Sequence, residues 1–477
     1  MKQIIILPID DRPCHTDFIL EATRNIHDVK VDMVPKSYLG HFTHAGDTIA
    51  IRKYLLDHCA EADTLVISID ALLFGGLVQS RTMDATKTQQ DYDALLQTLR
   101  DVKDLNPNIK ILAYSVIVRL TTTVTDSSQL QIWEDLFEYS QLVHRVTREP
   151  QFKAQLQLVT QRIPETVLAD YLAARQRNHH FNKACVDLAN EGILDYVSLV
   201  QEDTHEFGLH VREQEVLLNM IETHALQDCV SIKNGTDEMV ALLVARDLNQ
   251  NTKGFNVDVK FVDPQYIAKF EDRTIIENIA GAFKVANMTP TEKETPYVFL
   301  TLPATGQTID LAFEPKQTTP SLTTGQLEYY ERYNDKNLFV LDVQYGNGGD
   351  IRSLDRLLNK LNNATLQGYS AWNTGSNSIG TLVLDLVVAM YYDTNPTYIK
   401  HRVIDDALYQ GDIRLLVNAK MRDLGFDVWA ENYSDTINDY LTTLLNAEAR
   451  KYSFLDTPEF QAYLPWGRSF EVAMKEI

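Results

Sequence analysis

Ten short apolar runs, rich in β-branched residues, recur along the chain with helical patterns between them. Most of these runs are continuous rather than alternating, which indicates strands that are covered on both faces. Strands that alternate with helices predict an α/β architecture, here a mostly parallel sheet flanked by helices. The predicted strands cover residues 3–9, 31–35, 64–69, 110–117, 195–201, 229–232, 257–262, 297–302, 338–343 and 368–372.

The number of strands bears on the topology. Ten strands exceed the eight of a single barrel, so either two are peripheral or the chain divides near residue 250, where "DLNQNTKGFN" is polar and lacks periodicity. We favour a (β/α)8-like barrel over two doubly wound domains. Residues 127–190 show helical periodicity without a strand, which predicts a helical insertion in an α/β catalytic region of residues 1–390. Residues 391–477 are predicted to form a helical C-terminal region.

Charge and cysteine content exclude several classes of partner. The 477 residues carry a net charge of −22, with a pI near 4.9. A nucleic acid would be repelled by this charge, and a small neutral polyhydroxylated substrate is expected unless arginines gather locally. The four cysteines are dispersed, no secretory signal begins the chain, and no apolar window is long enough to span a membrane. These features predict a cytoplasmic protein without a membrane partner, and they leave its oligomeric state open.

Polar residues follow most of the predicted strands. Any one such cluster is ordinary, because acids and glycines at strand ends cap helices and make turns. Parallel strands, however, end at one edge of a sheet, where ligands of α/β proteins bind. We therefore expect a site there, and its candidates in chain order are Asp10, Asp11, Arg12, Asp70, Arg119, Glu202, Asp203, Asp342, Asn347, Asp350, Trp372, Asn373 and Asn377.

Three familiar motifs are absent or incomplete. "HEFGLH" (205–210) has one residue too many for a zinc-binding helix, because a separation of five residues turns the second imidazole roughly 140° from the first. "YGNGGD" (345–350) lacks the full dinucleotide fingerprint and a P-loop lysine. No G-x-S-x-G occurs. We therefore expect no cofactor and assign no metal.

Carboxylate chemistry is what remains. Glu202 and Asp203 are adjacent at a strand end, so their side chains point to different sides. Two nearby acids also raise the pKa of one of them, which keeps a proton available near neutral pH. Trp372 offers a flat face for a sugar ring, or else belongs to the core. Acids, amides and an aromatic ring together suit a polyhydroxylated ligand.

Several motifs in a fixed order carry a resemblance to a known family. They are "LPIDDRP", "SIDALLFGGLVQSR", "RQRNHHFN", "VQEDTHEFGLHVREQE", "GTDEMVALLVAR", "DVQYGNGGD" and "AWNTGSNSIGT". Over nearly its whole length the chain resembles the bacterial family of domain of unknown function 4127, whose name implies no activity. The site pattern is also loosely similar to that of the substrate-assisted β-N-acetylhexosaminidases. That likeness implies that Glu202 orients the acetamido group and that Asp203 is the general acid.

The residues favour a glycoside hydrolase that uses Asp203 and Glu202 as its acid/base pair. One alternative is a metal-dependent isomerase, lyase or amidohydrolase, with ligands drawn from Asp10, Asp70, Glu202, Asp203 and His205. Another is a cytosolic sugar-binding protein without catalysis, whose two lobes meet near residue 250.

Two further segments are predicted to reach the site. In residues 164–192 a polar helix face carries Arg175 and His179, one of which we expect to touch the substrate or a catalytic carboxylate. Residues 370–390 leave a strand and enter an almost wholly apolar helix, whose free N–H groups should face the site. Because capping needs only one polar side chain, we expect Asn373 or Asn377 to bind substrate.

Overall fold

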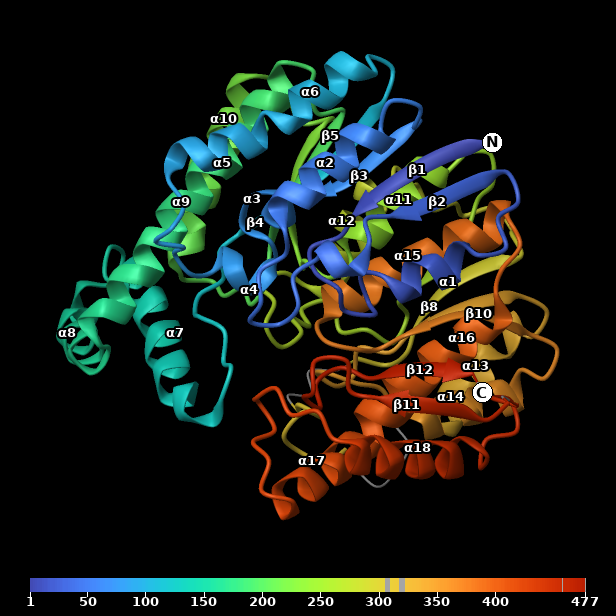
Figure 1. Ribbon diagram of the computed structural model, residues 1–477. Helices are drawn as coiled ribbons and strands as arrows, with labels where there is room; N and C mark the ends of the chain where they lie inside the picture. The colour runs from blue at the N-terminus through green and yellow to red at the C-terminus, as the bar shows by residue number, and fades with distance from the viewer. Residues whose placement is uncertain (305–308, 317–321, 457, 477) are drawn as a thin grey trace. The chain divides into compact units, whose positions relative to one another are not determined.

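The computed structural model describes residues 1–304, 309–316, 322–456 and 458–476. Within the regions predicted from the sequence, positions 305–308, 317–321, 457 and 477 lie outside the described residues. The chain divides into two compact units (Figure 1). Unit 1 comprises Met1–Thr16 and His27–Leu243, and unit 2 comprises Asp17–Ile26 and Val244–Ile477. Each unit contains its own parallel sheet.

Unit 1 is built on a six-stranded sheet in the order β2-β1-β3-β4-β5-β6, in which every neighbouring pair is parallel. The chain order reverses at β1, which lies between β2 and β3, so the topological switch point is at the carboxyl ends of β1 and β3. The strands are β1 (Lys2–Leu7), β2 (Val29–Met33), β3 (Thr64–Ser68), β4 (Lys110–Ile117), β5 (Tyr196–Gln201) and β6 (Val230–Asn234).

The continuous apolar runs form these strands because both faces of the sheet are covered. All five residues of β3 are buried, as are seven of the eight residues of β4. One face packs against helices through a core that includes Leu65, Ile67 and Ile111. The helices of this unit are α2 (Thr48–His58), α3 (Ile69–Phe74), α4 (Leu77–Ser80), α5 (Gln89–Leu96), α6 (Thr98–Leu105), α7 (Leu130–Arg145), α8 (Lys153–Arg162), α9 (Glu165–Asn190) and α10 (Leu209–Thr223).

Loops after the first and the last strands of unit 1 meet above its sheet. β1 and β6 are separated by three strands, which places their ends roughly 19 Å apart in a flat sheet. Arg12, five residues after β1, bonds to Asp237, three residues after β6, at 2.9 Å. The loops that follow the strands therefore bring these side chains together.

The predicted helical insertion is present as α7, α8 and α9. Figure 1 shows α7 and α8 standing apart from the sheet, while α9 runs back along it. The helices of this arm hold a small apolar cluster of their own, centred on Leu136, Val159 and Tyr171. The 26-residue α9 also contacts β4 and β5, so it joins the arm to the sheet.

Unit 2 contains a four-stranded parallel sheet in the order β10-β9-β8-β7. Its strands are β7 (Asn256–Asp258), β8 (Tyr297–Thr301), β9 (Asn337–Leu341) and β10 (Thr365–Ser370). Its helices are α1 (Asp17–Thr23), α12 (Ile275–Val285), α13 (Thr324–Tyr330), α14 (Ile351–Lys360), α15 (Gly375–Tyr391), α16 (Pro396–Val403), a π-helix (Ile404–Ile413), α17 (Arg414–Asp423) and α18 (Asp435–Ala449). The remaining helix, α11 (Met239–Leu248), runs across the boundary between the units.

The C-terminal region differs from its prediction in two respects. Its helices share one apolar core with β8, β9 and β10, through residues such as Val403, Leu408 and Leu441. It also ends in an antiparallel hairpin of β11 (Phe460–Tyr463) and β12 (Ala473–Glu476), so the prediction of helix throughout was wrong. Buried and exposed residues alternate along β11. Four residues are too few for this alternation to be recognised in the sequence.

The predicted strands and the mostly parallel, helix-flanked sheets are confirmed, but the barrel is not. Among the described residues no sheet closes on itself: β2 and β6 are the edges of one sheet, and β7 and β10 are the edges of the other. A barrel would require pairing between the first and the last strand of a sheet. No described helix has both the length and the apolar composition that crossing a membrane demands.

Candidate functional site

The predicted site residues fall into two sets, and each set is described within its own unit. Unit 1 holds Asp10, Asp11, Arg12, Asp70, Arg119, Arg175, His179, Glu202 and Asp203. Unit 2 holds Asp342, Asn347, Asp350, Trp372, Asn373 and Asn377.

Arg12 is the centre of a buried ionic network in unit 1. Its guanidinium donates to Asp10 Oδ2 at 2.9 Å and to both carboxylate oxygens of Asp237, at 2.9 and 3.2 Å. The three side chains are at most 5% exposed. Burial alone raises the pKa of Asp10, but Arg12 and His15 lower it to about 2. The network thus holds its carboxylates ionised by supplying cations at close range.

His15 lies between the two carboxylates of this network. Its Nδ1 is 2.6 Å from Asp10 Oδ1, and its Nε2 is 3.1 Å from Asp237 Oδ1. Although burial lowers it, the contact with Asp10 raises the pKa of His15 well above its usual range. The neighbouring Cys14 is partly buried, and its thiol pKa is raised by burial, against the lowering effect of His15 and Arg12.

Glu202 and Asp203 follow β5, and each forms an ion pair with an arginine: Arg81 caps the end of α4, and Arg119 follows β4. Arg81 pairs with Glu202, and Arg119 Nη1 donates to Asp203 Oδ2 at 2.8 Å. The carboxylate side chains are 15% and 16% exposed, so both reach solvent, unlike Asp10 and Asp237. Asp203 has a φ of 48°, a left-handed conformation that is uncommon outside glycine and that clusters at functional sites.

The charges around Arg12 and those around Glu202 and Asp203 act on one another, as the pKa of Arg81 shows. Burial first, and then the charge of Arg119, lower the pKa of Arg81 well below its usual range, and Arg12 adds to the lowering. Three guanidinium groups therefore crowd together and are balanced by carboxylates. We call this set the arginine–carboxylate cluster; its members are Arg12, Arg81, Arg119, Asp10, Asp237, Glu202 and Asp203.

Asp11 faces a different partner from that of Asp10. His41 Nδ1 lies 2.7 Å from Asp11 Oδ2, and the imidazole is 33% exposed. The loop that carries His41 is held tightly against the turn after β3, because a Cβ on Gly40 would lie 2.3 Å from the carbonyl oxygen of Gly75. The result is an Asp–His dyad that reaches solvent at the switch point of the sheet.

Asp70, by contrast, lies inside the protein. It is 1% exposed in α3 and accepts a hydrogen bond from the backbone N–H of Val116 at 2.8 Å. Burial raises its pKa to about 7, although Val116 and Arg177 oppose that rise. Asp70 therefore ties α3 to β4, and in this structure no ligand can reach it from solvent.

The polar face of α9 is buried against the strand ends. Arg175 donates to the carbonyls of Val118 and Arg119, each at 2.7 Å, and pairs with Glu213 at 2.6 Å. Arg177 and Asn178 both donate to the carbonyl of Ser80, next to Arg81. These residues fix the backbone from which two cluster arginines project, so they act on the site through other residues.

His179 lies on the same helix but does not share this role. It is partly exposed, and burial, with Lys183 and Arg175, lowers its pKa to about 4. Arg175 contacts a carboxylate, but that of Glu213 rather than Glu202 or Asp203. The predicted substrate contact of Arg175 or His179 stays a prediction.

Several buried polar atoms beside the cluster have no hydrogen-bond partner among the described residues. They are Arg81 Nε, Gln201 Oε1 and Thr236 Oγ1, from side chains that are 5%, 0% and 3% exposed. Buried polar groups in folded proteins are nearly always bonded, so such atoms point to a partner such as water or a ligand. They include a donor, an acceptor and a hydroxyl that can be either.

In unit 2 the predicted acids are part of the architecture. Asp342 is 1% exposed and accepts from the backbone N–H of Asp350 at 2.8 Å and from the Tyr369 hydroxyl at 3.1 Å. Asp350 is fully buried at the start of α14, where Lys316 and Arg352 pair with it. Asn347 is 5% exposed and donates to Asp310 at 2.9 Å. Asp342 and Asp350 are thus buried and bonded within unit 2, and the expectation that they bind substrate stays a prediction.

The segment after β10 also departs from its prediction. Trp372 is 3% exposed and packs on Phe470, so its ring is not a free face for a sugar. The start of α15 is capped twice, because Thr374 accepts from the N–H of Asn377 and Glu271 accepts from the N–H of Ser376. Its N–H groups are therefore bonded within unit 2 rather than presented to a ligand.

Asn377 and Asn373 differ in their surroundings. Asn377 donates to the carbonyl of Trp372 at 3.2 Å and is 3% exposed. Asn373 is partly exposed and has a φ of 66°, a left-handed conformation that asparagine tolerates well. Asn373 thus remains the more accessible of the two amides.

Comparison with known proteins identifies the family. The model of a family described as "Protein of unknown function (DUF4127)" matches residues 4–475. The chain belongs to this family. Neither a curated protein nor a solved structure gives a significant match to it. The likeness to substrate-assisted N-acetylhexosaminidases gains no support from these comparisons and stays a prediction.

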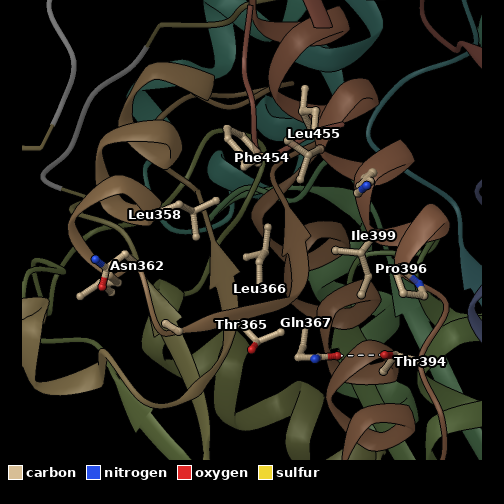
Figure 2. Close-up of a pocket in the computed structure, with 14 residues that line it drawn as sticks. Leu358, Asn362, Thr365, Leu366, Gln367, Thr394, Pro396, Ile399, Phe454 and Leu455 are labelled. Carbon is tan, nitrogen blue, oxygen red and sulfur yellow. Dashed lines mark hydrogen bonds between the residues drawn. The ribbon is translucent and has the colours of Figure 1, made fainter. Parts of the chain in front are cut away.

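An apolar hollow of about 380 Å³ in unit 2 of this DUF4127 protein lies away from all the predicted site residues. Figure 2 shows Leu366, Ile399 and Leu455 at its wall, with Gln367 bonded to Thr394. The hollow adjoins the first residues of β10, the end opposite to Trp372. Its lining includes Lys400 but no acidic residue, so it lacks the groups that hydrolysis requires.

Sequence reasoning about this DUF4127 chain missed three side chains that matter. His15 and His41 were not among the predicted site residues, and neither was Asp237, which lies within the motif "GTDEMVALLVAR". The bond from Arg12 to Asp237 spans 225 positions, so no local spacing could reveal it. The one sequence signal was the histidine two residues beyond the "DDRP" motif, at the carboxyl end of the first strand.

Proposed function

We propose that this protein is a carbohydrate-active hydrolase whose site is the arginine–carboxylate cluster of unit 1. The carrying observation is Asp203: it reaches solvent at a strand end, pairs with Arg119, and has a left-handed backbone conformation. Strain of this kind persists only where the surroundings impose it, and it is frequent at active sites. Its neighbour Glu202 is held in the same way by Arg81.

The ion pairs suggest how the two carboxylates divide the work. Arg119 Nη1 holds Asp203 Oδ2 at 2.8 Å, and we assign Asp203 the part of base or nucleophile rather than that of the proton donor, which the resemblance implied. Glu202 suits orientation of a sugar hydroxyl through its free oxygen. The proton donor that we assign is His41, which Asp11 holds through Nδ1 and which is 33% exposed.

A neutral substrate fits the charge balance. The three arginines of the cluster are opposed by four carboxylates, and His15 lies among them, so no excess of positive charge remains to attract an anion. The unbonded atoms of Arg81, Gln201 and Thr236 offer a donor and acceptors instead. Sugar hydroxyls donate and accept, so they match such a set.

A panel of aryl glycosides that includes N-acetylhexosaminides tests the proposal. The unmodified protein should turn over at least one member, and Asp203→Asn should lower kcat roughly 100- to 10,000-fold without unfolding the protein. Glu206→Gln is the matched control, because Glu206 is exposed in the same loop. No turnover on the panel, or full activity in Asp203→Asn, would contradict the proposal.

The role of His41 has its own test. An acid is needed most when the leaving group is a poor one. His41→Ala should therefore slow glycosides with basic leaving phenols far more than those with acidic phenols. An equal loss across the series would remove the assignment of His41 as proton donor.

The sequence left two alternatives, a metal-dependent enzyme and a sugar-binding protein without catalysis. Both can be tested on the same purified protein. The ligand set that was expected for a metal-dependent enzyme includes Asp70, which is buried on α3, and Glu202 and Asp203, which arginines hold. A sugar-binding protein without catalysis would use the same unbonded polar atoms. Calorimetry that showed saturable sugar binding, with the sugar recovered unchanged, would favour that alternative over hydrolysis.

A further inference from the structure

Three potential metal ligands converge where the ends of β1 and β6 meet. Cys14 Sγ, a ring nitrogen of His15 and a carboxylate oxygen of Asp237 lie within 4.8 Å of one another. Across residues 1–304, 309–316, 322–456 and 458–476, these three form the one group of histidine, cysteine and acidic side chains that is compact enough to hold an ion. None of the three belongs to the solvent-reaching pair Glu202 and Asp203.

His15 bonds to a carboxylate through each ring nitrogen, so a metal ion at Nε2 would replace the proton that now faces Asp237. Its Nδ1 bonds to Asp10 Oδ1 at 2.6 Å, which turns Nε2 toward Asp237 Oδ1 at 3.1 Å. A histidine that binds a metal almost always donates its other ring N–H to such a carboxylate, which fixes the tautomer and the ring orientation. Arg12 bonds to both Asp10 and Asp237 and so holds the two carboxylates in place.

The dimensions also suit a four-coordinate site. Zinc bonds of about 2.0–2.1 Å to nitrogen or oxygen and about 2.3 Å to sulfur put neighbouring ligand atoms roughly 3.3–3.6 Å apart. The Nε2 and Oδ1 atoms are already near that separation. Cys14 as a residue is partly exposed, whereas His15 and Asp237 are buried.

We propose that Cys14, His15 and Asp237 bind one divalent transition metal of the zinc type, with Asp10 and Arg12 as positioning residues. Thiolate, imidazole and carboxylate ligands together favour this class over magnesium or calcium. With Cys14 ionised, the negative charges of Cys14, Asp10 and Asp237 equal the positive charges of Arg12 and one divalent ion. The buried group is then neutral, as burial requires. This site shares Asp10, Arg12 and Asp237 with the arginine–carboxylate cluster, but it goes beyond the proposed hydrolase, whose steps are assigned to Asp203, Glu202 and His41.

Cobalt(II) added to the metal-depleted full-length protein tests the site by spectroscopy. One ion per chain should bind and produce a near-ultraviolet thiolate-to-cobalt charge-transfer band together with the intense visible bands of four-coordinate cobalt. Cys14→Ser should remove the charge-transfer band, whereas Cys229→Ser, a partly buried thiol elsewhere in unit 1, should retain it. Asp10→Asn should keep the band but weaken binding roughly 10- to 100-fold.

A measurement on the unmodified protein guards against variants that fold poorly. Bound zinc should protect Cys14 from alkylation and leave the rate at Cys229 unchanged, as mapped by peptide mass spectrometry. The proposal is overturned by absence of saturable binding, by a charge-transfer band that survives Cys14→Ser, or by equal alkylation of Cys14 with and without zinc. Hydrolysis of glycosides is a separate readout, so failure of this site leaves the test of Asp203 intact.

Discussion

The two units differ in how they accommodate buried carboxylates. In unit 1 each acid of the cluster has a cation in contact, and Arg12 and His15 lower the pKa of Asp10 to about 2 against the effect of burial. In unit 2 Asp350 is likewise paired with Lys316 and Arg352, but burial raises the pKa of Asp342 to about 6 and that of Asp385, on α15, to about 8. The cluster of unit 1 is therefore built from compensated charge, whereas at Asp342 and Asp385 of unit 2 the effect of burial outweighs the groups that oppose it.

This difference separates a site from a scaffold. Glu202 and Asp203 reach solvent beside arginines, at 15% and 16% exposure, so a ligand has access to them. Asp342 and Asp406 of unit 2 instead accept hydrogen bonds from backbone N–H groups. Asp406 on the π-helix accepts from the N–H groups of Ala371 and Trp372 and from Arg402, which fixes the end of β10.

The largest effect that follows concerns Arg12. Arg12→Met should lower the free energy of unfolding by about 3–5 kcal/mol, because it leaves Asp10 and Asp237 buried without their cation. Chemical denaturation measures the loss. The control is Arg100→Met, which breaks an ion pair with Glu191 that is 35% and 45% exposed and should cost about 0–1 kcal/mol. Equal losses in both variants would show that the buried network is not held by charge.

The acids of unit 2 predict a dependence of stability on pH. Burial raises the pKa of Asp385 to about 8 and Asp406 adds to the rise, although Arg402 and Tyr398 oppose it. A raised folded-state pKa means that the stabilisation is complete below the unfolded value of about 4 and is lost as the pH rises through about 8.

Asp385→Asn should therefore remove a decline of about 1.4 kcal/mol per pH unit between about pH 5 and pH 8. Denaturation followed by tryptophan fluorescence is suitable, since Trp372, Trp429 and Trp466 all belong to unit 2. Asp393→Asn is the control, because Asp393 is exposed. An unchanged slope in Asp385→Asn would mean that this acid is ionised in the folded protein.

A smaller effect is expected from Asn178 on α9, which holds the backbone next to Arg81 of the cluster. Asn178→Ala removes the side-chain bond to the Ser80 carbonyl at 2.9 Å and should cost about 1–3 kcal/mol, since the site is buried. Turnover per folded molecule should fall as well, because the backbone beside Arg81 loses a fixed point. The neighbouring Gln176→Ala should change neither quantity, as Gln176 is exposed. Loss of stability with unchanged turnover would make α9 a purely structural helix.

The smallest effect is expected at Asn373 in unit 2. Asn373 has a φ of 66°, so Asn373→Ala should cost about 1 kcal/mol of strain while Asn373→Gly should not. If turnover per folded molecule is equal in both variants and in the unmodified protein, the amide is architectural. A tenfold fall in Asn373→Gly, with stability retained, would restore the substrate contact predicted from the sequence.

Strand positions could be predicted from the sequence because a strand covered on both faces shows itself as a continuous apolar run. β3 and β4 are of this kind, with nearly every residue buried. The hairpin of β11 and β12 could not, because four residues with alternating burial give too short a pattern. The closed barrel was wrong, since strand number alone does not determine which edges pair.

The site was predictable only in part, for a related reason. The strand-end rule correctly brought Arg12, Arg119, Glu202 and Asp203 to one edge of one unit. It could not separate side chains that reach solvent from buried ones such as Asp70 and Asp342, because burial depends on what packs above them. The contact of Arg12 with Asp237 joins loops that are 225 positions apart in the sequence, which no local pattern encodes.

A matched pair of substitutions at the two strand edges tests the central claim most directly. Asp203→Asn and Asp342→Asn each exchange one strand-end carboxylate for an amide of the same shape, and kcat on a turned-over glycoside is measured beside the free energy of unfolding. Asp203→Asn should lower kcat roughly 100- to 10,000-fold with little change in stability. Asp342→Asn should cost about 1–3 kcal/mol of stability, through the bonds to Asp350 and Tyr369, and leave kcat per folded molecule unchanged. An unaltered kcat in Asp203→Asn, or an equal fall in Asp342→Asn, would contradict the division into a catalytic edge and a structural one.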